Sequence, residues 1–562
     1  MAARLKIKSI ISAVLRIYQQ NIRKLFAYSV VDLYFSDTFT LTLKQMEFTL
    51  GIEWEGFEKD KYTHSVLEDN ILPTYINQCR WFAGKARRIE GLKIRHVIKL
   101  PLENGTACFL IFESKYSEGD SEQYLLPISF IEDDTQELHP KGIICKATLD
   151  DKSGTLVDAI YDETFRMALF QNIVKSGEVK QKNGDLLSFA KGKALSDEAI
   201  ATSCLPDIDS SNSAMTFGDK YFLKLYRKLF SETNPEVEMV AFMTQNSDFR
   251  NIPRFAGSLT WNRTEDADIT FGMMVEVIEN DKDDWSKTGD YLNDFLFAFV
   301  EGNFQIKENV FDKVSLLAKR TAEMHLALFA LRGEEAFRAE PFERPYRRYI
   351  HQKVEDLLER RYNLLTDNYL KLDEQSQQLA WIFMESKDLI IEFFDQILTR
   401  PLESYRTRIH GDYHLGQVLV TGDDLTIIDF EGEPEGSIKE RKIKHSPLKD
   451  VAGMIRSYHY AVSAKLFNSP ETDSLDPAVL QRAADRWYKL IRDTYTEEYF
   501  AVFGAPHPLF KNNNEINYLL LFHLLEKAIY ELGYEVNYRP TWVKIPLRGI
   551  VEVIREIEKL KR

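Results

Sequence analysis

Cysteine is scarce in this sequence, and no two cysteines form a close pair. The four cysteines in 562 residues are Cys79, Cys108, Cys145 and Cys204, with no Cys-x-x-Cys motif. Disulfide frameworks and structural zinc sites need cysteines at short, paired spacings. The sequence therefore argues against both, and it fits a protein of the reducing cytoplasm.

Long apolar runs and an excess of positive charge are also absent. No apolar run approaches the roughly 20 residues that a membrane-spanning helix requires. The 72 Lys and Arg residues are outnumbered by 87 Asp and Glu residues, for a net charge of −15. Nucleic-acid binding needs clustered positive charge to neutralise phosphates. We therefore expect neither a membrane nor a nucleic acid among the partners.

Residues 1–60 form a segment for which the sequence predicts no role. The segment starts with basic residues and a short apolar run, as a signal peptide would. However, Arg16 interrupts the apolar run after Ile10–Leu15, and no cleavage site of small residues follows. We expect an amphipathic N-terminal extension or an early start codon.

The common glycine-rich phosphate-binding motifs are missing as well. The two Gly-Lys pairs, at 84–85 and 192–193, lack the upstream glycine of GxxxxGK[ST], which excludes a P-loop fold, and no GxGxxG occurs. A phosphate group would have to be covered by residues 210–220, SSNSAMTFGDK. The groups available there are backbone amides and the hydroxyls of Ser211 or Ser213.

What is present is a change of pattern along the chain. Alternating apolar stretches between residues 92 and 156 predict strands, and so do the stretches around 213–229 and 269–278, where an FGD turn predicts a hairpin. From about Tyr291, apolar residues recur at helical spacing. The order of strands first and helices later predicts an α+β fold, with one short β-insertion near His410.

That insertion, residues 408–430, places polar residues around two short apolar strands. After Gln417 the sequence has an apolar strand, a turn and a second apolar strand. With a two-residue tip Gln417 faces Ile428, next to Asp429, and with a three-residue tip it faces Asp429 itself. In either register an amide oxygen and a carboxylate lie near Asp412. This oxygen-rich site suits Mg²⁺.

The spacing of Asp412, Gln417 and Asp429 is typical of a kinase catalytic loop followed by a metal-binding Asp-Phe-Gly. In that interpretation Asp412 orients a substrate hydroxyl and takes its proton, while Gln417 and Asp429 hold Mg²⁺ against the phosphates of ATP. Alternatively, the three residues only cap turns and end a strand. A metallohydrolase using His410 and His414 is a further alternative, but the other histidines are scattered along the chain.

A cation for the phosphates is available in KYFLKLYRKL, residues 220–229. Strand alternation separates Lys224 from its apolar neighbours, which makes it a candidate for the strand lysine that pairs with the α/β-phosphates. The alternative is an ordinary exposed lysine. A helix then starts with Asn234 as cap and Pro235 at its first position.

The partner of Lys224 and the adenine site are less sharply defined. Glu236 or Glu238 could reach back from the helix to Lys224, and Glu238 fits the helix-facing pattern better. The sequence MMVEVIEND predicts a strand leading into a hinge, where backbone atoms near Glu276 and Val277 could bind adenine.

Seven segments, in order, resemble one known family. They are LPTYINQCRWFAGKARRI, NPEVE, RTAEMHLAL, HGDYHLGQVL, IIDFEGEP, SPLKDVAGMIRSYHYA and YEVNYRPTWVKIPLRGI, and they run from about Ile71 to the C-terminus. They resemble the bacterial maltokinases, which also occur fused behind trehalose synthase. The resemblance implies ATP-dependent phosphorylation of maltose at its anomeric hydroxyl, giving maltose 1-phosphate for α-glucan (glycogen) synthesis.

The same resemblance implies a bilobal, aminoglycoside-phosphotransferase-like fold with an added N-terminal cap. It makes Asp412 the catalytic base, Gln417 and Asp429 the Mg²⁺ ligands, and Lys224 the lysine that binds ATP. It also suggests trehalose synthase as a partner. The expected units are the cap at residues 61–200, the N-lobe at 201–285 and the mainly helical C-lobe at 286–562.

Sugar hydroxyls need fixed polar partners next to apolar or aromatic faces. The candidates near the catalytic loop are Tyr413, His414, Glu431, Glu433, Lys449 and Arg456. Arg456 lies six positions after Asp450 on an expected helix, so these two side chains cannot both face the cleft. Trp542 could stack on a sugar or pack in the core.

Two other functions stay open. A glucosamine or other small-sugar kinase would share the HGD and IDFEGEP segments, and the acid-rich EGEPEG would suit an ammonium group. A catalytically silent partner of trehalose synthase is the second. The presence of Asp412, Gln417, Asp429 and Lys224 together argues against it.

Overall fold

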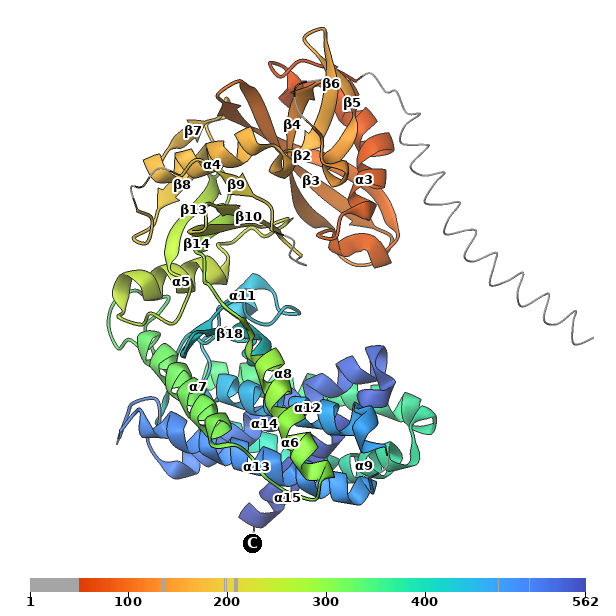
Figure 1. Cartoon of the computed structure of the whole chain (residues 1–562), viewed down its shortest axis with the longest axis vertical. Helices are drawn as coiled ribbons and strands as arrows, with labels where there is room; N and C mark the ends of the chain where they lie inside the picture. The colour runs from red at the N-terminus through yellow and green to blue at the C-terminus, as the bar shows by residue number, and fades with distance from the viewer. Residues whose placement is uncertain are drawn as a thin grey trace, which may run out of the picture.

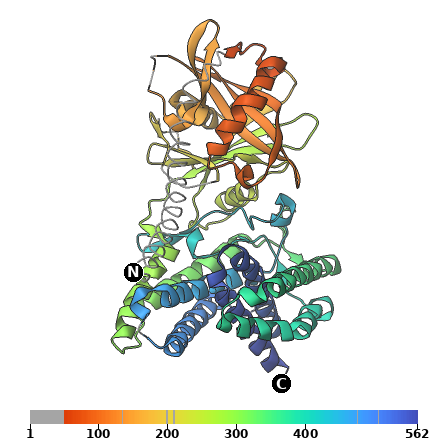
Figure 2. The same cartoon turned by 90° about the vertical axis from the view of Figure 1, so that its right-hand side faces the viewer.

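The computed structural model describes residues 50–561, apart from 134, 136, 197, 199, 207–210, 474 and 505. The expected N-terminal extension therefore lies mostly outside the described residues. The molecule is elongated, with two β-rich layers above a helical lobe (Figures 1 and 2). Strands dominate as far as residue 276 and helices afterwards, so the predicted α+β class is confirmed.

The first layer is a sheet with the strand order β1-β5-β6-β4-β3-β2. Strands predicted between residues 92 and 156 are present and include β2, β3 and β4. The strands are β1 (Leu50–Ile52), β2 (Ile89–Leu102), β3 (Gly105–Tyr116), β4 (Glu122–Glu132), β5 (Ile143–Leu149) and β6 (Lys152–Asp158). Helices α2 (Lys61–Val66) and α3 (Leu72–Gln78) belong to this layer, and apolar side chains of both pack against the sheet.

The second layer is a sheet with the order β7-β8-β13-β14-β11-β10-β9. Its strands are β7 (Glu178–Lys180), β8 (Leu186–Lys191), β9 (Ser203–Cys204), β10 (Ser213–Phe217), β11 (Tyr221–Leu225), β13 (Phe255–Asn262) and β14 (Ile269–Glu276). The predicted FGD hairpin is confirmed, because Phe217 pairs with Tyr221 around Gly218, whose φ is +53°. Glycine adopts such a φ readily because it has no Cβ.

The two layers share one hydrophobic core. Phe109 of β3 lies 5.5 Å, centroid to centroid, from Phe271 of β14 and from Phe165 of α4 (Glu163–Lys175). A two-residue strand, β12 (Lys228–Leu229), leaves the second layer to pair with β4. The second sheet includes β7 at Glu178, and the first includes β1 at Leu50, so neither sheet is limited by the boundaries expected at residues 200 and 60, which stay predictions.

The helical lobe follows from residue 284. Its helices are α6 (Asp284–Val300), α7 (Glu308–Ala327), α8 (Arg344–Asn368), α9 (Glu374–Glu385), α10 (Lys387–Thr399), α11 (Ile438–Arg441), α12 (Leu448–Asn468), α13 (Pro477–Ala501), α14 (Asn513–Tyr538) and α15 (Lys544–Leu560). Two small sheets interrupt it: β15 (Lys282–Asp283) with β18 (Val418–Thr421) and β19 (Asp424–Ile427), and β16 (Glu340–Pro341) with β17 (Tyr405–Arg406). Among the described helices, none has the length and apolar character needed to cross a membrane.

Helix α5 (Pro235–Asn246) connects the second layer to this lobe. Its apolar residues Val240 and Met243 belong to the same buried cluster as the cores of α7, α12 and α14. Helix α5 is therefore packed into the helical lobe even though it follows the second sheet in sequence.

Asp284, the first residue of α6, gives a testable pH dependence of stability. It is 1% exposed, and neither carboxylate oxygen has a hydrogen-bond partner among the described residues. Burial raises the pKa of Asp284 from 3.8 to about 7. Between these values the folded protein keeps a proton that the unfolded chain releases. The free energy of unfolding therefore falls as pH rises through this window.

Replacing Asp284 by Asn removes this titration. When the pH is raised from 5 to 8, we expect the free energy of unfolding of the Asp284→Asn variant to fall by about 2–3 kcal/mol less than that of the wild type. Urea unfolding of both proteins at the two pH values measures the difference, and every other titrating group is common to both. Parallel stability profiles would show that Asp284 does not titrate as described.

Candidate active site

The β18–β19 hairpin aims Gln417 at Asp429. Val418 pairs with Ile427 and Thr421 with Asp424, so of the two registers left open by the sequence, the one with a two-residue tip is present. The Ile428 N–H donates to the Gln417 carbonyl at 3.0 Å. The Gln417 side-chain amide donates to Asp429 Oδ2 at 3.0 Å. The strand pairing thus fixes the two polar side chains on one edge of the hairpin.

The preceding loop is held from behind by Asp450, in the first turn of α12. Its two carboxylate oxygens accept the backbone N–H groups of His410 at 2.7 Å and Gly411 at 2.9 Å. His325 Nε2 lies 3.1 Å from Asp450 Oδ2, and this group is fully buried. This function of Asp450 could not be predicted from the sequence, because its partners lie far from it along the chain.

The two histidines of the H-x-D-x-H motif both bind backbone groups. His410 Nε2 lies 2.8 Å from the Ile428 carbonyl, and His414 Nδ1 accepts the Gly416 N–H at 3.1 Å. His410 thereby ties the loop to the residue before Asp429. This geometry supports a scaffold role for both rings and leaves the metallohydrolase interpretation without support.

Lys224 is the centre of a partly buried ion cluster. Its ammonium group lies 3.0 Å from Glu236 and 3.0 Å from Asp429, and it also pairs with Glu431. The preference for Glu238 is therefore wrong, because Glu236 is the partner. Positions 236 and 238 are about 200° apart around a helix. Glu238 consequently points to the opposite side of α5. The predicted Asn234 cap is confirmed, since its side chain accepts the Glu236 N–H at 2.8 Å.

The pKa values of the carboxylates in this cluster are shifted in different directions. One oxygen of each carboxylate of Glu236, Asp429 and Glu431 lies within 4.8 Å of the others. Burial raises the pKa of Glu236 to about 7. Burial would also raise the pKa of Asp429, but Lys224 holds it below its usual value. The three carboxylates and the amide oxygen of Gln417 form an oxygen-rich donor set suited to a hard cation such as Mg²⁺.

Three of the residues expected at the nucleotide are engaged elsewhere. The N–H groups of Glu276 and Val277 donate to the carbonyls of Arg254 at 3.0 Å and Lys220 at 2.7 Å, so neither is free for adenine. The Ser213 hydroxyl is buried and accepts Arg227 Nε at 2.6 Å. Ser211 is exposed beside β10, next to residues outside the described part of the chain.

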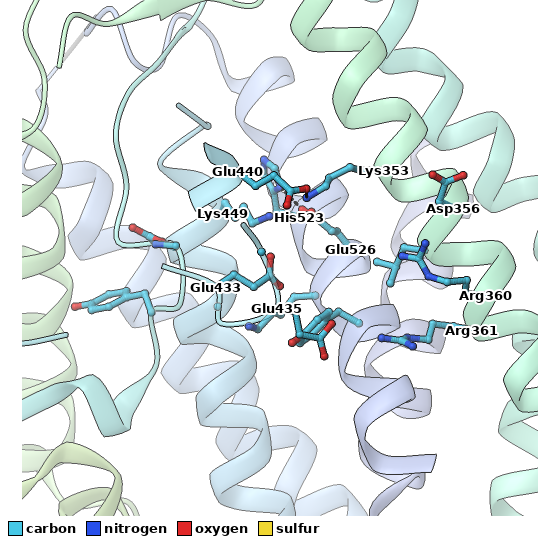
Figure 3. Close-up of a pocket in the computed structure, with 18 residues that line it drawn as sticks. Lys353, Asp356, Arg360, Arg361, Glu433, Glu435, Glu440, Lys449, His523 and Glu526 are labelled. Atoms are coloured by element: carbon cyan, nitrogen blue, oxygen red, sulfur yellow. Dashed lines mark hydrogen bonds and ion pairs between the residues drawn. The ribbon is translucent and has the colours of Figure 1, made fainter. Parts of the chain in front are cut away.

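A cavity of about 300 Å³ opens beside the catalytic loop. Asp412 lies at its edge, and Lys527 of α14 is 3.4 Å from the Asp412 carboxylate. Figure 3 shows charged side chains from α8 and α14 and from residues 433–440 around this space. The lining includes Lys353, Asp356, Arg360, Arg361, Glu433, Glu435, Glu440, Lys449, Glu526, Lys527 and Tyr530.

The six residues expected at the sugar separate into two groups. Glu433 and Lys449 line the cavity. Tyr413 also borders it, but its ring is 2% exposed and its hydroxyl lies 2.9 Å from Thr321 in the core. Glu431 belongs to the Lys224 cluster, and His414 binds the backbone. The remaining candidate, Arg456, is discussed next.

Arg456 has a structural role and does not reach the cavity. It is 2% exposed and binds Glu531 of α14 at 2.6 Å, packed against Gly549 of α15. The expectation that it contacts sugar is therefore wrong, because its helix face points between α14 and α15. Trp542 does not line the cavity either, and Arg539 lies over its ring at 4.7 Å.

The cavity residues on α8 and α14 were missed in the sequence. Lys527 and Tyr530 share a helix face with the acidic Glu526 nearby, in a helix that is otherwise mostly apolar. Polar residues in such a helix are a weak signal, and nothing in the sequence shows that they meet a loop more than a hundred positions away. The packing of α14 in the folded helical lobe brings these residues to the loop.

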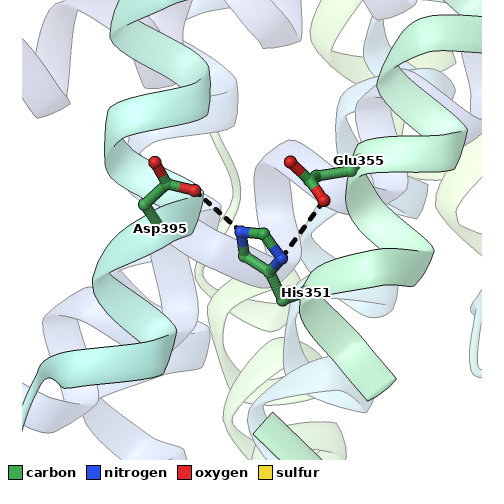
Figure 4. A group of neighbouring side chains, drawn as sticks. All are labelled: His351, Glu355 and Asp395. Atoms are coloured by element: carbon green, nitrogen blue, oxygen red, sulfur yellow. Dashed lines mark hydrogen bonds and ion pairs between the residues drawn. The ribbon is translucent and has the colours of Figure 1, made fainter. Parts of the chain in front are cut away.

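A second group of potential ligands lies on α8 and α10, outside this cavity. His351 Nδ1 is 3.3 Å from Glu355 and its Nε2 is 2.7 Å from Asp395 (Figure 4). The two carboxylates approach different edges of the ring. One ion cannot bind both nitrogens of one imidazole, so the group acts as a link between two helices.

Comparison with known proteins agrees with this layout. Residues 75–162 match the maltokinase N-terminal cap domain. A glucosamine kinase from Mycolicibacterium smegmatis is 25% identical over 395 residues, covering 69% of this chain and 86% of that protein. A glucosamine kinase from Streptacidiphilus jiangxiensis is 22% identical over 354 residues, covering 62% and 73%.

Solved structures share the fold. A glucosamine kinase crystal structure superposes with a TM-score of 0.60 at 16% identity, covering 84% of this chain and 96% of that one. A glucosamine kinase in complex with glucosamine, ADP and inorganic phosphate gives 0.59 at the same identity. The expected bilobal kinase-like fold with an N-terminal cap is confirmed, and the chain is maltokinase-like in its cap.

Proposed function

We propose that the protein is a sugar kinase that transfers the γ-phosphoryl group of ATP to the anomeric hydroxyl of maltose. The products would be maltose 1-phosphate, for α-glucan (glycogen) synthesis, and ADP. The observation that carries the proposal is the position of Asp412. Its carboxylate is 3.4 Å from Lys527, which lines the polar cavity, and its loop is tied through His410 to Ile428, the residue before Asp429 of the Lys224 cluster.

Each residue then has a role that its surroundings support. Asp412 accepts the proton of the attacking hydroxyl. Lys224 moves from its carboxylate partners to the α/β-phosphates when ATP enters. Gln417 and Asp429, with Glu431 beside them, would hold Mg²⁺. Bound Mg²⁺ would neutralise the charge of the phosphates. Lys527 keeps Asp412 oriented toward the cavity.

The charges of the cavity favour a neutral sugar over an amino sugar. Lys449 binds Glu526 at 2.9 Å, Lys353 binds Glu440 at 2.7 Å, and Lys527 binds Asp412 at 3.4 Å. Glu526, Glu440 and Asp412 are thus already matched by lysines, while Arg360 and Arg361 line the cavity together with Glu433 and Glu435. An ammonium group placed beside Asp412 would also meet Lys527, and like charges at such distances are unfavourable.

Substrate choice tests the proposal. We expect kcat/KM for maltose to exceed that for glucosamine by at least about 10-fold, since one unfavourable charge contact is worth more than about 1.4 kcal/mol in a partly buried site. ADP release measured with each sugar gives the ratio. The Lys527→Gln variant should shift the ratio toward glucosamine. If the wild type prefers glucosamine, the maltose proposal is wrong and glucosamine becomes the proposed substrate.

Two wider parts of the proposal concern a partner protein and the cellular compartment. The resemblance to proteins that also occur fused behind trehalose synthase supports that enzyme as a partner, and co-purification of the two would test it. All four cysteines are free thiols, which fits a reducing compartment such as the cytoplasm. The intact set of Asp412, Gln417, Asp429 and Lys224 argues against a silent binding partner.

A further inference from the structure

Glu238 binds two cations of the helical lobe. Arg408 Nη1 lies 3.1 Å from Glu238 Oε2, and Lys442 Nζ lies 2.5 Å from Glu238 Oε1. Each carboxylate oxygen therefore has its own partner. The Arg408 side chain is only 2% exposed. An ion pair with one fully buried member depends on its geometry, because a buried charge without its partner is strongly unfavourable.

An aromatic layer extends the same contact. Phe242, one helical turn after Glu238, stacks on Phe337 with ring centroids 3.7 Å apart and planes 5° apart. Arg408 lies over the Phe337 ring at 5.4 Å. Arg408 Nε and Nη2 have no hydrogen-bond partner in the described part of the chain. The buried guanidinium is thus held by Glu238 and by a cation–π contact.

These contacts join the two halves of the candidate active site. Arg408 lies four residues before Asp412, at the start of the same loop. Glu236, on the opposite side of α5, holds Lys224 at 3.0 Å. One helix thereby connects the lysine expected at the phosphates with the loop that carries the base.

We propose that Glu238 is a positioning residue that keeps Lys224 and Asp412 in register across the two lobes. The inference rests on the proposed function and adds a residue that touches neither substrate. Phosphoryl transfer requires the attacking oxygen and the phosphate to be in line, and a shift of about 1 Å can cost about 100-fold in rate. The Glu238–Arg408 pair limits such shifts between α5 and the catalytic loop.

The test compares Glu238→Gln, Arg408→Met and the double variant. We expect Glu238→Gln to lower kcat by about 10-fold. This fall in rate is smaller than the about 100-fold fall that a displacement of about 1 Å can cause. KM for the sugar, and the Kd for a non-hydrolysable ATP analogue measured by calorimetry, should stay within about two-fold. The double variant should be no slower than the slower single variant, because residues in one ion pair are not additive.

Two further variants separate positioning from simple loss of stability. Glu552→Gln removes a half-exposed carboxylate from the Arg492 ion pairs on α13 and α15, and its kcat should stay within about two-fold, as is usual for surface pairs. Phe242→Leu loosens the aromatic stack without leaving a buried charge, and it should lower kcat with unaltered KM even if Glu238→Gln folds poorly.

The outcomes distinguish this inference from the proposed function. Rates are compared on whichever sugar the wild type phosphorylates. Lack of wild-type sugar phosphorylation would overturn the proposed function. Wild-type activity together with unaltered kcat in folded Glu238→Gln and Phe242→Leu, or fully additive effects in the double variant, would overturn the positioning role alone.

Discussion

Replacing Asp412 by Asn should lower kcat for sugar phosphorylation by about 10²–10⁴-fold, the usual contribution of a general base. Asparagine keeps the size of the side chain but cannot accept the proton of the attacking hydroxyl. The Kd for ATP should stay within about two-fold, because Asp412 is not part of the Lys224 cluster. Steady-state rates and calorimetry with an ATP analogue measure the two quantities separately.

The matched control is Asp423→Asn at the tip of the β18–β19 hairpin. This residue is exposed and is part of neither the ion cluster nor the cavity lining. Its kcat should equal that of the wild type within about two-fold, as expected for surface substitutions. If Asp412→Asn turns over as fast as this control, Asp412 is not the base.

Replacing Asp429 by Asn should have an effect of similar size, for a different reason. The change removes a carboxylate from the donor set expected to hold Mg²⁺, and removing one such electrostatic contact typically costs about 10²–10³-fold in kcat. The Mg²⁺ concentration for half-maximal rate should rise as well. Titrating the rate with MgCl₂ at saturating ATP gives both values.

An unaltered Mg²⁺ requirement in Asp429→Asn would contradict its assignment as a metal ligand. The side chain also binds Lys224 and Gln417, so a fall in kcat alone could come from rearrangement of the cluster. The shift in Mg²⁺ dependence separates the two explanations. The Asp423→Asn control should show the wild-type requirement.

The hairpin that carries Gln417 could be predicted from the sequence alone. Its strands are short and apolar and are separated by a turn, so local rules predict the hairpin and leave two registers. The observed register is the one with a two-residue tip, in which Gln417 is followed across the hairpin by Ile428. The Asn234 cap and the FGD hairpin are predictable for the same reason.

The partner of Lys224 could not be predicted in this way. Glu236 and Glu238 are both in the first turn of α5, and sequence periodicity says only that they point in different directions. The docking of α5 against the helical lobe decides which one faces the strand. The same docking assigns Glu238 to Arg408 and Lys442.

The sugar cavity and the domain boundaries depend on contacts between distant segments. Lys527 reaches Asp412 only because α14 packs beside α12, and Arg456 is drawn between α14 and α15 for the same reason. The first two layers share one core, so no change of composition marks their boundary near residue 178. No short segment of the sequence predicts such packing.

Product identity tests the central claim most directly. A ³¹P NMR spectrum of the full chain with maltose, ATP and MgCl₂ should show ADP and a new phosphomonoester coupled to the anomeric proton, appearing at equal rates. The Asp412→Asn variant should produce neither. ADP with only inorganic phosphate, or a phosphomonoester at another carbon of the sugar, would contradict the account.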